Sequence, residues 1–189
     1  MDVSRRDLLR NLALSATLGG LSADAAQHVH HAAADEKKAT GVYKPKAFNA
    51  HEFKSLQSLT DTIIPGARAA GAAEFIDLLA SHNDELAAIY TGGIAWMDRE
   101  MHRRHGASNW VDAKKDQQTA LLDLIAYKKN DSAELGPGIR FFEWARKMAA
   151  DSYYTSKAGM EELGYKGNVG MTDFKIPPEA IDYALKRSP

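Results

Sequence analysis

One stripe of apolar residues constrains the fold of this chain more than any other feature. Across residues 84–105, large apolar side chains recur every three or four positions, as they do along one face of an α-helix. The stripe consists of Leu86, Tyr90, Ile94, Met97 and Met101. Asn83 can cap the start of this helix and Gly106 can end it. A helix of this length, about 33 Å, spans a small domain, so the other elements have to pack against it.

The rest of the pattern is helical as well. Asn49 and Glu52 have the spacing of a capping box, with Phe48 and Phe53 placed as a hydrophobic staple, and this helix has to end at Pro65. Further helices are expected over 72–80, after Trp110 with Asp112 as the candidate cap, from Pro137 to Tyr154, and after Pro177. No segment alternates with a period of two. The sequence therefore predicts an all-α fold, a compact helical domain of about five to six helices.

Composition excludes several classes of protein. The 24 lysines and arginines nearly balance the 25 aspartates and glutamates, and the net charge of -1 argues against a nucleic-acid partner. The chain contains no cysteine, which excludes disulfides, thiolate nucleophiles and cysteine-bound zinc or iron–sulfur clusters.

The first 25 residues have the three parts of an export signal. Arg5 and Arg6 precede a weakly apolar stretch over 11–21, and Ala23 and Ala25 provide the small-x-small pattern of a cleavage site. The arginine pair is typical of a twin-arginine (Tat) signal, which exports folded proteins, so we expect a periplasmic location. The alternative is a chance arginine pair beside an ordinary amphipathic helix.

The domain organisation follows from this. Residues 1–25 are interpreted as the signal peptide, 26–47 as a flexible tether and 48–189 as the helical domain. The tether is polar, rich in small residues and without periodicity.

After Tyr154 the helical pattern gives way to a long glycine-punctuated C-terminal loop. Such a loop is uncommon in a compact domain unless it is functional or disordered, and this one carries several large apolar groups. Tyrosine suits interfaces because its ring buries area while its hydroxyl finds a hydrogen-bond partner. We expect a partner interface here, formed by Tyr153, Tyr154, Met160, Leu163 and Tyr165. The alternative is that these side chains fold back on their own helices.

No catalytic motif or cofactor cradle is found in the sequence. There is no serine elbow, no dinucleotide fingerprint and no Glu-x-x-His pair. Asp98, His102 and His105, spaced four and three apart, form a weak candidate metal site. The neighbouring arginines oppose a cation, and a solvated helix end explains the same residues more simply.

Four stretches together resemble the gluconate 2-dehydrogenase subunit 3 family. Residues 59–66 read Leu-Thr-Asp-Thr-Ile-Ile-Pro-Gly, and residues 73–77 read Ala-Glu-Phe-Ile-Asp. The Leu121-Leu122 helix over 117–126 and the Leu-Gly-Tyr-Lys-Gly-Asn run over 163–168 fit the same pattern. The similarity extends over about 48–168, and a twin-arginine start is usual in this family.

The resemblance implies a non-catalytic accessory, or gamma, subunit. Such proteins accompany an FAD-dependent large subunit of the glucose–methanol–choline type that oxidises a sugar or polyol, often together with a cytochrome c subunit. FAD is then expected in the partner and no cofactor in this chain. The accessory subunit assists folding, assembly and export through the Tat translocase, and membrane association comes through the partners.

Two other readings remain open. The chain could be an independent exported helical protein that binds a metal or another ligand. It could also be an enzyme of another type that uses the cluster of Asp98, His102 and His105.

Overall fold

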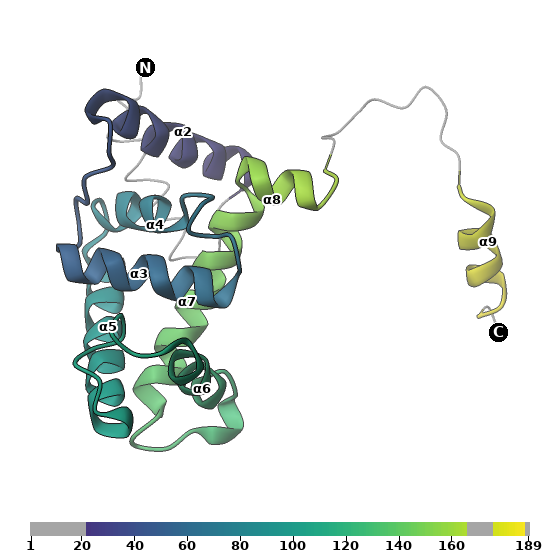
Figure 1. The fold of residues 1–189 in the computed structure, drawn as a ribbon. Coiled ribbons are helices and arrows are strands. Elements are labelled where there is room, and N and C mark those ends of the chain that lie inside the picture. Colours follow the sequence, from purple (N-terminus) through teal and green to yellow (C-terminus); the bar gives the residue numbers. More distant parts are fainter. Residues whose placement is uncertain (1–21, 166–175, 188–189) are drawn as a thin grey trace.

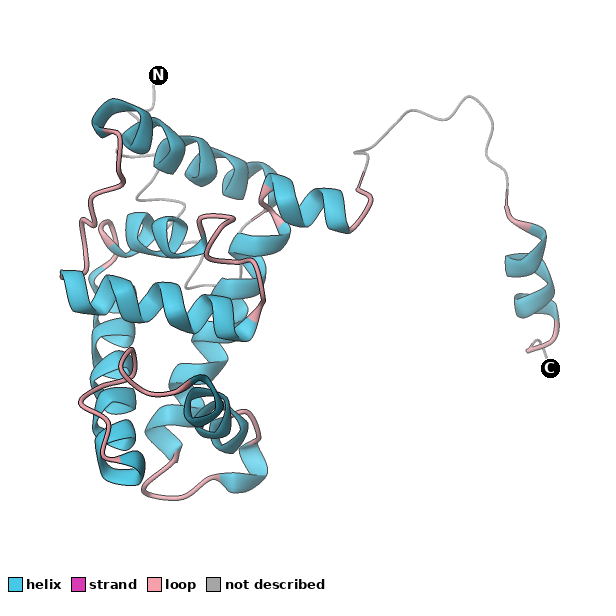
Figure 2. Cartoon of the chain, in the orientation of Figure 1, coloured by secondary structure: helices cyan, strands magenta, loops and turns pink. Residues whose placement is uncertain are grey.

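The computed structural model describes residues 22–165 and 176–187, and these form eight α-helices and no strand (Figures 1 and 2). The predicted all-α fold is confirmed. The elements are α2 (Ala23–Thr40), α3 (Ala50–Ile63), α4 (Ala72–Ala80), α5 (Asp84–His105), α6 (Lys115–Ile125), a 3-10 turn η1 (Lys128–Asn130), α7 (Gly136–Tyr154), α8 (Lys157–Glu162) and α9 (Pro178–Leu185).

Helix α4 is the buried centre of the fold. All of its residues except Glu74 are buried, because its sequence is apolar around nearly the whole circumference. It contacts α2 and α3 on its flanks and also α5 and α7. Figure 1 shows α2, α4 and α3 lying across α5 and α7, which run alongside each other. Helix α6 packs against α5 and α7.

Two glycines allow α5 and α7 to approach closely. A Cβ atom at Gly93 of α5 would overlap the ring of Phe141, and one at Gly138 of α7 would overlap the ring of Trp96. Phe141 also packs edge-on against Tyr90, with ring centroids 5.6 Å apart. The contact between the two longest helices therefore depends on positions without side chains.

The helix caps follow the sequence signals, with one exception. Asn49 and Glu52 form the predicted capping box, and Asn83 and Gly106 cap α5 as expected. The proposed cap of α6 at Asp112 is wrong. Asp112 instead exchanges hydrogen bonds with Asn109 in the preceding turn, and α6 begins three residues later.

The segment interpreted as a flexible tether is mostly helix. Its residues 26–40 belong to α2, which packs against α4. The buried face consists of Ala26, Val29, Ala32 and Ala33, in which Val29 follows Ala26 by three positions and precedes the two later alanines by three and four. Alanine is the best helix former, but it is only weakly hydrophobic. The helical periodicity of this buried face is therefore difficult to recognise in the sequence. The tether prediction is therefore corrected.

The C-terminal loop is also partly helical. Ser156 caps α8 by accepting a hydrogen bond from the Gly159 backbone N–H, and the chain then turns at Gly164 with a φ of 63°. The later glycines of the predicted loop lie outside the described residues, as do Arg5 and Arg6 of the signal. None of the described helices has the length and apolar character needed to cross a membrane.

Candidate partner interface

Exposed large apolar side chains concentrate in the C-terminal part of the chain. Of the nine such side chains among the described residues, seven follow Tyr153. They are Tyr154, Leu163, Tyr165, Ile176, Ile181, Tyr183 and Leu185. Scattered single exposures are ordinary on a protein surface, whereas a concentration of this kind is typical of an interaction site.

Tyr153 is buried and holds the exposed residues that follow it in position. It is only 8% exposed, and its ring lies against Gly66 in the connection between α3 and α4. Its hydroxyl donates a 2.6 Å hydrogen bond to Glu162 at the end of α8. The Tyr154 ring stands edge-on to it at 5.1 Å and is 39% exposed. Tyr153 therefore fixes α8 against α7, while Tyr154 faces outward.

Helix α2 braces the same junction. The side-chain amide of Gln27 donates to the Thr155 carbonyl at 2.7 Å and to the Met160 sulfur at 3.6 Å. Met160 is partly buried by this contact. Of the five residues predicted for the interface, three are therefore exposed, namely Tyr154, Leu163 and Tyr165, which we call the tyrosine surface. The other two, Tyr153 and Met160, position it.

Helix α9 carries further exposed apolar side chains. It has no buried residue, and in Figure 1 it stands apart from the other helices. Ile181 and Leu185 lie one turn apart on it. An isolated helix of eight residues is marginal in water, so an apolar face on it indicates docking to another surface. The sequence predicted this helix, but its exposed apolar face was missed. The spacing of Ile181 and Leu185 in a segment with no core to join was the available signal.

The three candidate metal residues, Asp98, His102 and His105, do not form a metal site. One carboxylate oxygen of Asp98 accepts from the Trp110 backbone N–H at 2.8 Å, and the other lies 2.7 Å from Nε2 of His51. His102 and His105 are exposed. Within residues 22–165 and 176–187, no three His, Cys, Asp or Glu side chains are grouped so that they could hold a metal ion. Asp98 instead joins α5 to α3 and to the segment before α6, and the predicted cluster is not formed.

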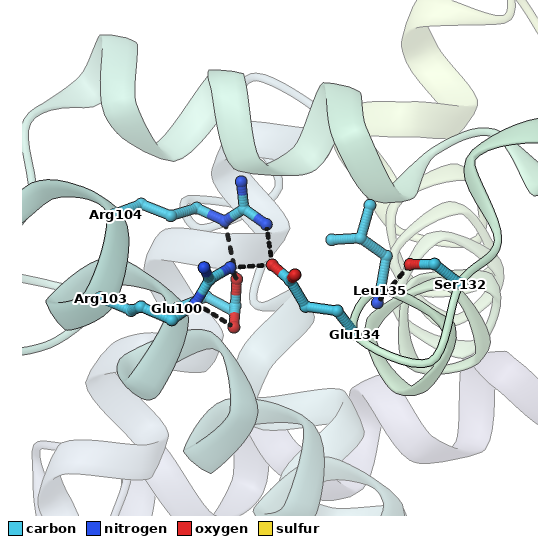
Figure 3. A network of polar contacts seen from close by, with 6 residues as sticks. All are labelled: Glu100, Arg103, Arg104, Ser132, Glu134 and Leu135. Atoms are coloured by element: carbon cyan, nitrogen blue, oxygen red, sulfur yellow. Dashed lines mark hydrogen bonds and ion pairs between the residues drawn. The ribbon is translucent and has the colours of Figure 1, made fainter.

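The arginines at the end of α5 belong to a structural network (Figure 3). Arg103 and Arg104 both bind the carboxylate of Glu100, which is 7% exposed. Both also pair with Glu134, two residues before α7 begins. These arginines hydrogen-bond Glu100 and keep its pKa below its ordinary value, although burial opposes them. The network fastens the end of α5 to the start of α7.

Comparison with known proteins gives one match. The sequence profile of the family described as gluconate 2-dehydrogenase subunit 3 matches residues 50–170. This range runs from α3 past α8 and covers well over half of the chain. The comparison with curated proteins gave no match, and neither did the comparison with solved structures.

Proposed function

Because the chain belongs to the gluconate 2-dehydrogenase subunit 3 family, we propose that it is the non-catalytic accessory subunit of a periplasmic FAD-dependent dehydrogenase. The catalytic partner is of the glucose–methanol–choline type, acts on a sugar or polyol, and holds the flavin. A cytochrome c subunit completes the complex where electrons pass to the respiratory chain, and association with the membrane then comes through these partners.

The observation that carries this proposal is the distribution of exposed apolar side chains. The tyrosine surface and α9 together hold most of the large apolar groups that the described residues leave exposed. Tyrosine and large aliphatic residues at such positions are typical of the contact surfaces of subunits. In the proposal, the large subunit covers both elements.

The arginine pair gives the accessory subunit a second task. A flavoprotein has to fold around its cofactor before it leaves the cytoplasm, and the twin-arginine route accepts folded proteins. A small subunit that carries the signal and binds the folded large subunit exports both chains together. This explains why a chain of this size carries an export signal and a docking surface.

The proposal is tested by replacing Arg5 and Arg6 with lysine in cells that express both chains. We expect both chains to remain in the cytoplasm, as measured by fractionation and by dehydrogenase activity in the periplasm. Arg10→Lys is the control, because it makes the same change outside the pair and should leave export intact. Normal periplasmic delivery of the double variant would contradict the export role.

A second experiment tests the accessory role without relying on export. A candidate FAD-dependent large subunit from the same genome is co-expressed with this chain, and the complex is purified through a tag on this chain. We expect the large subunit and its FAD to co-purify, with the flavin remaining on the large subunit after the chains are separated. A dehydrogenase that folds, binds FAD and turns over without this chain present would contradict the assembly role.

A further inference from the structure

A cavity of about 600 Å³ opens on the side of the molecule formed by α2, α3 and the connection between α3 and α4. Its volume lies within the usual range for small-molecule sites. Its apolar walls are made of small side chains, which leave the space open: Ala33, Ala34, Ala69 and Ala70. The rest of its lining is polar and comes from several separate elements.

Two cations line this cavity. Lys37 comes from α2 and Arg68 from the connection between α3 and α4. The backbone N–H of Arg68 donates to Asp61, whereas neither cationic side chain has a hydrogen-bond or ion-pair partner in the part of the chain that the structure describes. Both attract the carboxyl group of Glu74 electrostatically.

Asp61 and Glu74, the two acidic residues that line the cavity, differ in their hydrogen bonding. One oxygen of Asp61 accepts hydrogen bonds from the backbone N–H groups of Gly66 and Arg68, at 3.0 and 3.3 Å, and so holds the connection in shape. Oε2 of Glu74 is shielded from solvent and has no hydrogen-bond partner among the described residues. Burial raises the pKa of Glu74 above its ordinary value, and the charge of Asp77 adds to this rise. A hydrogen bond from its own backbone and the charges of Lys37 and Arg68 oppose it. A buried polar atom without a partner is costly and calls for an explanation.

The remaining polar groups add no negative charge. Burial lowers the pKa of His30 to about 4, so its ring is neutral at neutral pH, and Nε2 lies 3.1 Å from the Thr155 hydroxyl. Helix α4 begins at the edge of the cavity, where Gly71 provides no side-chain cap and the helix dipole contributes partial positive charge. Positive charge in the cavity therefore comes from Lys37, Arg68 and the start of α4.

We propose that this cavity binds a small organic anion, whose carboxylate or phosphate group accepts hydrogen bonds from Lys37 and Arg68 and lies beside Oε2 of Glu74. A single oxyanion would contact both cations, whose side chains are exposed, and the one shielded oxygen of Glu74 that has no hydrogen-bond partner among the described residues. The alanine walls leave room for a short aliphatic body. The inference stands independently of the accessory role.

Binding is measured by titration calorimetry and thermal shift on the full-length chain, with succinate and inorganic phosphate as probes and 1,4-butanediol as the uncharged counterpart of succinate. We expect saturable binding and a raised melting temperature with at least one anion and none with the diol. The anion that binds more tightly shows whether the site prefers a carboxylate or a phosphate group. Absence of saturable binding for both anions, or equal binding of the diol, would overturn the proposal.

Variants locate the site. Lys37→Gln and Arg68→Gln should each weaken binding of the anion about tenfold or more, since each removes one charged hydrogen bond. Lys38→Gln is the matched control, because it makes the same change on the exposed neighbouring residue, which does not line the cavity. Equal weakening by Lys38→Gln would show attraction to net charge and would refute a defined site.

Glu74→Gln tests the carboxyl group. Glutamine stays neutral and keeps a donor, so the variant should bind the anion at least as tightly as the wild type near neutral pH. Anion affinity of the wild type should fall as the pH rises through the pKa of Glu74, while that of the variant should stay level. Loss of anion binding in Glu74→Gln with its fold intact would show that the anion does not accept a hydrogen bond from a neutral group at this position.

Discussion

The hydroxyl of Tyr43 donates a 2.8 Å hydrogen bond to the carboxylate of Asp77 and so ties the connection between α2 and α3 to the buried helix α4. The same carboxylate accepts the backbone N–H groups of Lys46, Ala47 and Phe48 at 2.8 to 3.1 Å. Asp77 is fully buried. Burial and the neighbouring Asp77 raise the pKa of Tyr43 well above its ordinary value, so its hydroxyl remains a donor.

Replacing Asp77 should destabilise the fold strongly. Asp77→Ala leaves four donors without their acceptor, and we expect the free energy of unfolding to fall by about 3–5 kcal/mol. Asp77→Asn keeps one acceptor oxygen and should cost less. Denaturant unfolding measures both. Asp123→Ala, on an exposed position of α6, is the control and should change stability by about 0.5 kcal/mol at most. Similar losses of stability for Asp77→Ala and Asp123→Ala would show that other contacts hold the connection between α2 and α3.

Adjacent glycines in α5 should respond in opposite directions to alanine. At Gly92 a Cβ meets nothing within 4 Å, so Gly92→Ala should stabilise the helix by up to about 1 kcal/mol through propensity alone. At Gly93 the Cβ would overlap Phe141, so Gly93→Ala should destabilise by about 1–3 kcal/mol. Thermal unfolding of the two variants gives the comparison. The same sign for both would mean that α5 and α7 pack less closely than described.

The buried imidazole of His30 should make stability depend on pH. Because burial lowers its folded pKa from 6.5 to about 4, the unfolded chain binds a proton in this range that the folded chain does not. The free energy of unfolding should therefore fall as the pH drops from about 6.5 to about 4, by up to about 1.4 kcal/mol per pH unit from this group.

The difference between wild type and His30→Gln isolates the contribution of this histidine, since the carboxyl groups titrate in both proteins. His105→Gln makes the same change at an exposed position and is the control. Parallel profiles for wild type and His30→Gln would place the ring in contact with solvent.

Tyr165→Ala should separate binding from stability. The side chain is 57% exposed, so the melting temperature of the isolated chain should barely change. Affinity for the dehydrogenase subunit should fall by about 2 kcal/mol if Tyr165 is a central contact. Tyr127→Ala is a close control, because Tyr127 is also 57% exposed but lies after α6. A loss of affinity that is equal in both variants, or absent in Tyr165→Ala, would remove the tyrosine surface from the interface.

The helices that the sequence predicted share large apolar side chains at helical spacing, as Leu86 and Tyr90 do in α5. Helix α2 was missed because its buried face is mostly alanine, and alanine becomes part of a core only when a neighbour such as α4 covers it. Helix α8 was missed because Gly159 reads as a loop residue. In the structure a Cβ there would overlap the Tyr153 backbone, so the glycine permits a close crossing instead.

The candidate partner interface was also predictable only in part from the sequence. Exposed apolar residues after Tyr154 were visible as a local cluster, and three of the five named side chains are exposed. The burial of Tyr153 depends on Gly66 and Glu162, and neither contact has a sequence pattern. The cavity beside α4 joins residues from positions 30 to 74, so only the folded chain brings Lys37 and Arg68 together.

The packing of α2 also bears on the timing of signal removal. Ser22 caps this helix, and the predicted cleavage after Ala25 falls within its first turn. Cutting there would make Ala26 the first residue, and Ala26 is completely buried. A new terminal ammonium group cannot remain in an apolar contact, so the first turn would have to unwind to hydrate it. Cleavage after Ala25 in an already folded chain would therefore loosen the packing of α2 on α4, whereas a chain that keeps its first 25 residues would retain that packing.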